Sequence, residues 1–315
     1  ITFNNFYIKK NKYWTLTKNK SQNNFKLDFD EVENLLQKSV EKHLISDVPI
    51  NVLLSGGLDS SIISYLANKI NKKNQLSTIT IDMDKNLSID EKENINYLTK
   101  NYEIKNKILN VSNTNIIKDI DKNIEVFDDL QSADAGYLTN NEIAKNLKEI
   151  NCKVVLVGDG SDEIFGGYSW FGLSKFPFNL LGSSIKNLIY FYAISRSIKL
   201  MNKTNIIKQF SNNINNFKGS YFDKVCQNEL FNQLPNNYLM KVDKPFMRNG
   251  IESRVPYLDH KLVEKVFNLE EKFKLSGKTY SLSSFQQSNE KYILRKIAKK
   301  YFNNNIQQQR FNIFK

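Results

Sequence analysis

A glycine turn between an apolar run and an amphipathic stretch constrains the fold of this chain more than any other feature. Residues 50–54 (Ile-Asn-Val-Leu-Leu) have the composition of a buried strand, and Ser55, Gly56 and Gly57 follow at once. Apolar residues at helical spacing come next: Leu58, Ile62, Ile63, Leu66, Ala67 and Ile70. A strand, a glycine turn and a helix are the first part of a βαβ unit. The chain is therefore expected to contain a parallel sheet covered by helices.

The alternation of strands and helices continues to residue 157. Further strands are predicted at 76–81, 107–111 and 153–157, and helices at 30–45, 89–101, from about 115, and 137–150. This order predicts an α/β fold with a doubly wound parallel sheet, helices on both faces, and ligands at the carboxyl ends of the strands. After about Trp170 the strand signals fade, so residues 171–315 are predicted to be mostly helical. Residues 1–27 are typical of a short strand pair or a connecting arm.

The first glycine turn has the composition of a phosphate site. It reads Ser55-Gly56-Gly57-Leu58-Asp59-Ser60-Ser61. Glycines let backbone N–H groups converge on an anion, the following helix adds its positive N-terminus, and hydroxyls add neutral donors. The alternative is a tight turn with capping serines. The only Gly-Lys-Thr in the chain, at residues 277–279, has Lys272 where a Walker A loop needs its earlier glycine.

A second glycine-rich turn, residues 158–168, follows the strand at 153–157 and holds three carboxylates. Asp159, Asp162 and Glu163 lie within five residues, and Glu163 stands where a dinucleotide fingerprint would need a third glycine. Like charges repel, so such a cluster persists best around a cation. The alternative is a solvated acidic turn that caps the next helix.

The spacing of the first turn resembles the pyrophosphate loop, or PP-loop, of the ATP pyrophosphatase superfamily. Two further segments extend the resemblance: residues 243–259, which include Glu252-Ser-Arg254, and Lys291-Tyr-Ile-Leu-Arg295. Together the four ordered motifs, over about residues 28–310, resemble the synthetase half of the glutamine-hydrolysing asparagine synthetase family. The resemblance implies an adenine nucleotide alpha hydrolase-like fold.

The resemblance also implies a two-step reaction. A carboxylate attacks the α-phosphate of Mg-ATP, and ammonia then displaces AMP from the acyl-adenylate to leave an amide. It assigns catalysis to Lys291, Asp159 and Glu163, with Asp159 handling the ammonia proton, and Mg²⁺ binding to Asp59 and Asp162. The implied ATP and pyrophosphate contacts are Leu54, Ser55, Gly56, Gly57, Leu58, Asp59, Ser60, Ser61, Ile81, Val157 and Gly158. Glu252 and Arg254 are expected to form a structural ion pair and turn.

The resemblance divides the chain into three parts. Residues 1–27 would be a connecting arm and the tail of a glutaminase domain, residues 28–170 the PP-loop core, and residues 171–315 a helical part of the same synthetase domain. The chain starts at Ile1 and has no cysteine before Cys152, although complete family members release ammonia with an N-terminal cysteine. We expect a glutaminase domain in a longer chain or in a partner. Direct use of free ammonia stays open.

The acceptor acid is less constrained than the reaction type. Family members hold the α-carboxylate of aspartate with an arginine that would fall near Gln131, and no arginine occurs in residues 1–195. A neutral glutamine cannot replace a bidentate guanidinium. Aspartate is the favoured acceptor, and a sugar acid, a peptide carboxylate or another small acid are the alternatives.

Composition bears on partners and location. Lys and Arg number 45 against 33 Asp and Glu, a net charge of +12 that raises the question of nucleic acid. Only five of the 45 are arginine and the lysines are scattered, which indicates a compositional bias. The longest apolar run is too short to cross a membrane, no signal peptide is visible, and two cysteines make no disulfide framework. We expect a cytoplasmic protein without nucleic-acid or membrane partners. A homodimer, a PP-loop enzyme that modifies tRNA and a non-catalytic basic module stay open.

Overall fold

A five-stranded parallel sheet forms the centre of the protein. The computed structural model describes residues 2–4, 7–9, 12–17, 29–71, 76–112, 136–195, 204–277 and 290–302. Its sheet has the order β5-β4-β3-β6-β7, made of β3 (Ile50–Leu53), β4 (Ser77–Met83), β5 (Lys105–Val111), β6 (Val154–Leu156) and β7 (Glu252–Arg254). All neighbouring pairs are parallel. The strand order reverses between β3 and β6, which is the switch point of a doubly wound sheet. The predicted fold class is confirmed.

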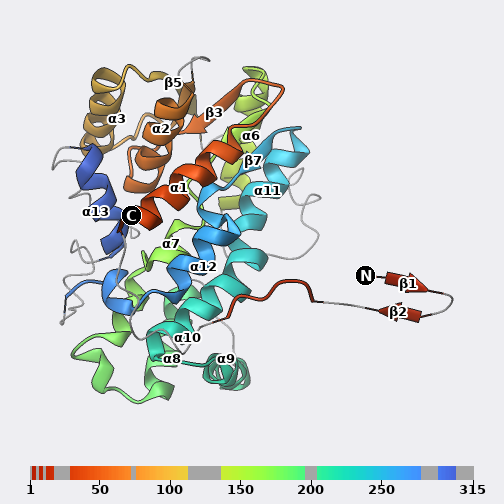
Figure 1. The fold of residues 1–315 in the computed structure, drawn as a ribbon, viewed down its shortest axis with the longest axis vertical. Helices are drawn as coiled ribbons and strands as arrows, with labels where there is room; N and C mark the ends of the chain where they lie inside the picture. Colours follow the sequence, from red (N-terminus) through yellow and green to blue (C-terminus); the bar gives the residue numbers. More distant parts are fainter. Residues whose placement is uncertain are drawn as a thin grey trace.

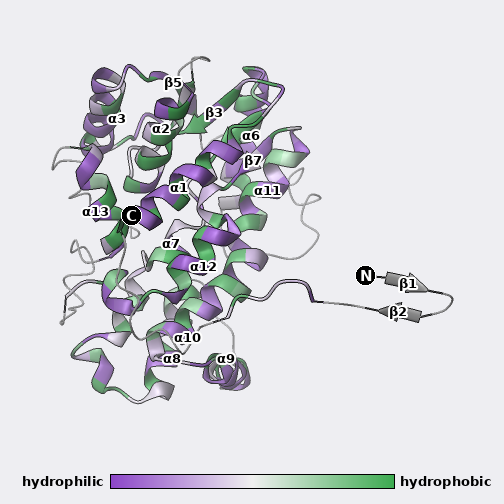
Figure 2. Ribbon diagram, viewed as in Figure 1, coloured by the Kyte–Doolittle hydropathy of each residue, from purple (hydrophilic) through white to green (hydrophobic). Residues whose placement is uncertain are grey.

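Helices cover both faces of this sheet (Figure 1). On one face, Val52 and Leu156 pack with α1 (Phe29–His43), α2 (Leu58–Ile70), α3 (Ile89–Asn101), α12 (His260–Asn268) and α13 (Tyr292–Tyr301). On the other, Ile79 and Val155 pack with α6 (Gly136–Glu149) and α11 (Leu239–Arg248). Neighbours in a strand point to opposite faces, so Val155 and Leu156 belong to different layers of the core. In Figure 2, β3 is green and α3 carries much purple, as expected for an inner strand and an outer helix.

The predicted elements of the first half lie within two residues of their predicted limits. For example, α3 begins after Ser88, whose hydroxyl accepts a hydrogen bond from the backbone N–H of Glu91, while the Glu91 carboxylate accepts one from the backbone N–H of Ser88. This reciprocal capping box sets the start of the helix. Near the N-terminus, β1 (Thr2–Asn4) and β2 (Tyr7–Lys9) form an antiparallel pair, as predicted. The helix predicted from about residue 115 lies outside the described residues.

The second half is mostly helical, as predicted, and adds one strand that was not. Its helices before α11 are α7 (Ser161–Phe165), α8 (Ser183–Ile194), α9 (Thr204–Asn216), α10 (Tyr221–Asn228), the 3-10 turns η1 (Ser169–Ser174) and η2 (Phe178–Leu180), and the π-helical η3 (Glu229–Tyr238). Two further 3-10 turns, η4 (Pro256–Leu258) and η5 (Glu271–Phe273), flank α12. The sequence does not predict strand β7, because its three residues are polar or charged and show no apolar alternation. No helix among the described residues is both long and apolar enough to cross a bilayer.

Arg254 ties β7 to the end of α1. Its Nε donates to the Glu252 carboxylate at 2.7 Å, and its Nη1 donates to the backbone oxygens of His43 and Ile45, each at 2.7 Å. The contact with Arg254 lowers the pKa of Glu252, because the hydrogen bond favours the charged carboxylate. This is the structural ion pair that the sequence predicted.

Candidate active site

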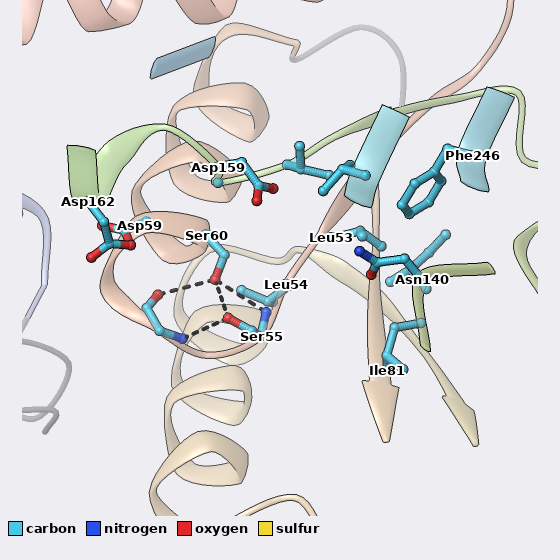
Figure 3. A pocket seen from close by; sticks show the side chains of 15 residues that line it. Leu53, Leu54, Ser55, Asp59, Ser60, Ile81, Asn140, Asp159, Asp162 and Phe246 are labelled. Carbon is cyan, nitrogen blue, oxygen red and sulfur yellow. Dashed lines mark hydrogen bonds between the residues drawn. The ribbon is translucent and has the colours of Figure 1, made fainter. Parts of the chain in front are cut away.

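The first glycine turn, residues 55–61, lies at the carboxyl end of β3 and leads into α2; its resemblance gives it the name PP-loop. The hydroxyls of Ser55 and Ser60 lie 3.0 Å apart, and the backbone N–H of Ser55 donates to Ser60 Oγ at 3.2 Å. The backbone N–H of Gly57 donates to Ser55 Oγ at 3.3 Å. Backbone amides, two hydroxyls and the first turn of α2 therefore converge on one point (Figure 3). That arrangement suits a phosphate group.

Gly56 is required by the loop on two counts. Its φ of +80° lies in the left-handed region, and a Cβ there would lie 2.8 Å from the backbone oxygen of Glu91 in α3. The Gly56 carbonyl in turn accepts a hydrogen bond from Asn94 Nδ2 at 3.1 Å. The close approach of α3 thus fixes the loop from behind.

A pocket of about 340 Å³ opens beside the loop, at the switch point of the sheet. One end is polar, and its side chains are Ser55, Ser60, Asp59, Asp159 and Asp162. The other end is apolar apart from Asn140, and its side chains come from Leu53, Leu54, Ile79, Ile81, Val157, Val242 and Phe246. Figure 3 shows the acidic side chains at one side of the view and Phe246, Asn140 and Ile81 at the other. A volume of this size is in the range of small-molecule sites.

Lys291 connects the first glycine turn with the acidic turn, although it lies 232 residues from Asp59 in the sequence. Its Nζ lies 2.5 Å from Asp59 Oδ2 and 2.7 Å from Asp162 Oδ1, and it donates to Ser161 Oγ at 2.8 Å. Lys291 is only 2% exposed, so it is not a surface lysine. Burial disfavours the ammonium, but the two carboxylates outweigh that cost and raise the pKa of Lys291. The lysine therefore stays charged.

Gly167 leaves the space in which this ion cluster forms. A Cβ at position 167 would lie 1.9 Å from Asp162 Oδ1 and 2.2 Å from Lys291 Cε. Both distances are far inside van der Waals contact. The second glycine of the Gly166-Gly167 pair is thus a requirement of the Lys291–Asp162 contact.

Burial and like charges perturb the acidic turn. Burial, followed by repulsion from Asp162, raises the pKa of Asp159 to about 6. The same two causes raise the pKa of Glu163 to about 8, although Tyr168 donates a hydrogen bond to its Oε1 at 2.6 Å. Burial also raises the pKa of Asp162, against the opposing effect of Lys291. Shifted carboxyls in a pocket are typical of functional sites.

A second buried carboxyl, Glu229, lies behind this turn. Its Oε1 accepts hydrogen bonds from Trp170 Nε1 at 2.9 Å and Tyr190 Oη at 2.6 Å. Glu229 is fully buried, and burial raises its pKa to about 8. The Trp170 ring stacks on Tyr168, with centroids 4.5 Å apart, and so connects Glu229 with the Tyr168–Glu163 contact. No sequence pattern had singled out Glu229.

The structure brings most of the predicted site residues together. Ten of them line the pocket: Leu54, Ser55, Gly57, Asp59, Ser60, Ile81, Val157, Gly158, Asp159 and Asp162. Gly56 shapes the loop, Leu58 packs in the core, Ser61 is buried within α2, and Glu163 and Lys291 lie behind the pocket wall. Gln131 lies outside the described residues.

The sequence patterns do not identify most of the residues at the apolar end of the pocket. Leu53 and Ile79 were assigned to strands without a site role, and Asn140, Val242 and Phe246 come from α6 and α11. Their patterns are those of ordinary helices. Only Leu53 and Ile79, at the carboxyl ends of predicted strands, carried a signal that the strand-end rule could have used.

The carboxylates at the polar end of the pocket are possible ligands of a metal ion. No group of three or more His, Cys, Asp or Glu residues with metal-site geometry occurs in the part of the chain that the structure describes. Mg²⁺, however, is commonly held by one or two carboxylates and substrate phosphates. Asp59 Oδ1 is buried and has no hydrogen-bond partner among the described residues, which suits a ligand of a cation. Asp59 and Asp162 are therefore suitable Mg²⁺ ligands.

The fold and this site define a class. A doubly wound sheet with a glycine turn at its switch point, an acidic turn beside it and a buried lysine make a site suited to a phosphate-bearing ligand. The chain belongs to the asparagine synthase family, whose model matches residues 31–311.

Two relatives illustrate the match. Asparagine synthetase B [glutamine-hydrolyzing] of Escherichia coli is 26% identical over 292 residues, which cover 87% of this chain and 42% of the relative. Asparagine synthetase [glutamine-hydrolyzing] 3 of Bacillus subtilis is 28% identical over 310 residues, with 90% and 48% covered. The chain thus spans less than half the length of these relatives. Among solved structures, an NH3-dependent NAD synthetase from Campylobacter jejuni aligns with a TM-score of 0.33 and 14% identity over 59% of this chain and 93% of that one.

Proposed function

We propose that this chain catalyses the ATP-dependent amidation of a carboxylic acid through an acyl-adenylate, with release of AMP and pyrophosphate. The observation that carries the proposal is the buried contact of Lys291 with Asp59 and Asp162 beside the PP-loop. It unites three separate motifs of the asparagine synthase family at one pocket.

In the first step, an oxygen of the acceptor carboxylate forms a bond to the α-phosphorus of ATP, and the bond to the bridging oxygen of the β-phosphate breaks. The leaving pyrophosphate is held by the Ser55 and Ser60 hydroxyls and the start of α2, which offers N–H groups without intrahelical acceptors and a positive dipole. Lys291 offsets the negative charge that builds at the phosphates, and in a buried site this effect is large.

In the second step, ammonia attacks the acyl carbon and AMP leaves with the electron pair of the broken C–O bond. The attacking nitrogen must lose a proton. Asp159 lines the pocket, and its pKa of about 6 leaves it mostly unprotonated at pH 7 yet a stronger base than an ordinary aspartate. Asp159 is the group that accepts this proton.

Mg²⁺ bound by Asp59 and Asp162 would neutralise phosphate charge at the polar end of the pocket. Asp59 Oδ1, which is buried and accepts no hydrogen bond from the described part of the chain, supports this assignment.

Aspartate is the first acceptor to test, because the curated relatives are named asparagine synthetases. Another acid is the second candidate: no Lys or Arg is among the residues that line the described pocket, and no arginine precedes Arg196. The relatives are also named glutamine-hydrolysing, so a glutaminase domain or partner is the proposed source of ammonia. We place the protein in the cytoplasm without a nucleic-acid partner.

The test is exchange of labelled pyrophosphate into ATP, run with a panel of carboxylic acids that starts with aspartate. Exchange requires only the first step, so it needs no ammonia source. We expect exchange that depends on one acid, and equal amounts of AMP and amide when ammonia is added. Release of ADP, or AMP release that depends on RNA and on none of the acids, would overturn the proposal.

A further inference from the structure

The pocket contains one polar side chain that the proposed chemistry does not use. Asn140 stands at the apolar end, in a wall otherwise made by Leu53, Ile81 and Phe246 among others. The polar end has hydroxyls and carboxylates for phosphates and a cation. A single amide among aliphatic and aromatic walls is the pattern by which pockets fix the orientation of a ligand.

The orientation of the Asn140 amide is fixed by α11. Its Nδ2 donates to the backbone oxygen of Lys241 at 2.8 Å. A carbonyl oxygen only accepts hydrogen bonds, so the NH2 group must face Lys241. Oδ1 is then the free end, and no hydrogen bond to it occurs among the described residues. Figure 3 shows the amide directed from its helix toward the pocket space between Leu53 and Ile81.

We propose that Asn140 selects adenine over other purines: its Oδ1 accepts a hydrogen bond from the exocyclic 6-amino group. The inference rests on the proposed use of ATP. A purine with a 6-oxo group would place two acceptor oxygens against each other, and a purine without a 6-substituent would leave Oδ1 unpaired. Both lose the hydrogen bond.

The walls of this end favour a neutral, flat ring over the acceptor acid. Ile81, Val157 and Phe246 are apolar, and Lys and Arg are absent from the described pocket lining. A carboxylate placed here would lose its hydration without gaining a cation, which is costly. The base of the nucleotide, with its phosphates at the PP-loop, avoids that cost.

The experiment measures dissociation constants of the full chain with Mg²⁺ for ATP, ITP and purine riboside triphosphate, which lacks the 6-amino group. A net hydrogen bond corresponds to roughly a three- to tenfold change in affinity. We expect the wild-type protein to bind ATP tighter than either analogue by roughly this factor. In Asn140→Leu, ATP and purine riboside triphosphate should bind equally.

The matched control is Asn146→Leu, on the same helix. Asn146 also donates from Nδ2 to a backbone oxygen, that of Glu142 at 2.9 Å, but does not line the pocket. This variant should keep the wild-type preference for ATP. An Asn140→Leu variant that keeps it too, or that changes only the KM of the acceptor acid, would overturn the inference.

The wild-type series decides the question even where Asn140→Leu does not fold. Equal affinity of the wild-type protein for ATP and purine riboside triphosphate overturns the role of Asn140 and leaves the proposed function standing. No binding of ATP at all overturns both.

Discussion

At the scale of the residue, Lys291 has the most demanding position in the protein. It has a left-handed backbone conformation, with φ +51°, just before α13. Its ammonium lies between two carboxylates in a buried site. Its removal would leave Asp59 and Asp162 as unpaired, mutually repelling charges. Both catalysis and stability should therefore depend on this one side chain.

We expect Lys291→Met to lower the rate of AMP formation by at least about 10²-fold, the usual cost of losing one preorganised charge or donor. Its free energy of unfolding should fall by about 3–5 kcal/mol because a buried ion pair is broken. Pyrophosphate exchange and urea denaturation measure the two effects. Lys299→Met, which removes an exposed lysine of α13, is the control. Wild-type exchange in Lys291→Met would contradict the assignment.

The raised pKa of Asp159 predicts a pH profile for amide formation. With a pKa of about 6, Asp159 loses its proton as pH rises from about 5 to 7, so the rate should rise through this range. The rate is measured with added ammonia at a constant concentration of the un-ionised form. Asp159→Asn should lower the rate by roughly 10²–10⁴-fold and remove the limb near pH 6. If the rate of Asp159→Asn still rises with pH near pH 6, the titrating group is another residue.

Glu229 predicts a pH dependence of stability. Its pKa is raised from 4.5 to about 8 in the folded protein, so between these values the folded state binds a proton that the unfolded state has released. This contribution is present at low pH and is lost as pH rises through about 8.

Glu229→Gln should remove that part of the pH dependence, since glutamine resembles the protonated acid and does not titrate. We expect the fall in unfolding free energy between pH 6 and pH 9 to be smaller than in the wild-type protein by on the order of 2 kcal/mol. Urea denaturation at both pH values measures it. The Glu163 carboxyl also has a raised pKa, so in Glu229→Gln it should still make the unfolding free energy fall with pH. Equal slopes in the two proteins would show that Glu229 does not bind a proton on folding.

At the scale of the element, the β3–loop–α2 unit is held by its neighbour α3. Glu91 and Asn94 of α3 touch the loop backbone at Gly56. The geometry of the loop therefore depends on α3 as well as on α2, although the loop residues themselves are contiguous in the sequence.

Gly56→Ala should destabilise the protein by about 1–3 kcal/mol, because alanine is strained at positive φ and its Cβ meets the Glu91 carbonyl. It should also weaken ATP binding, since the loop must shift. Gly182→Ala is the matched control: a Cβ there meets nothing within 4 Å, and φ is −59°. Thermal unfolding with and without Mg-ATP tests both variants. Similar losses in the two would refute a special role for Gly56.

At the scale of the whole molecule, the second half of the chain completes the site of the first. Strand β7 extends the sheet beside β6, α11 supplies Val242 and Phe246 to the pocket, and Lys291 arrives just before α13. Phe246 is 1% exposed and belongs to the same core cluster as Val155. Phe246 therefore belongs both to the pocket lining and to the core on this face of the sheet.

Phe246→Ala should cost about 3–5 kcal/mol of unfolding free energy, as large-to-small changes in cores do. It should also weaken ATP binding, because the apolar end of the pocket loses its aromatic side chain. Met247→Ala is the control, since Met247 is 54% exposed. Urea denaturation and nucleotide titration give the two quantities. Loss of stability with unchanged ATP affinity would make Phe246 a core residue only.

The parts of the fold and site that could be predicted are those whose cause is local in the sequence. Apolar period and turn residues identify β3, α2 and α3 to within two residues, because strand and helix periodicity and capping are local properties. The two glycine-rich turns identified the polar end of the pocket, since ligands of doubly wound sheets bind where strands end.

The remaining features depend on contacts between distant parts of the chain. Asn140 and Phe246 look like ordinary helix residues, Glu229 looks like a surface carboxylate, and β7 has no periodic signal. Each takes its role from partners about 60 to 200 residues away, as when Glu229 meets Trp170 or when β7 pairs with β6. Burial and proximity of this kind depend on how the whole chain packs, and no local pattern encodes them.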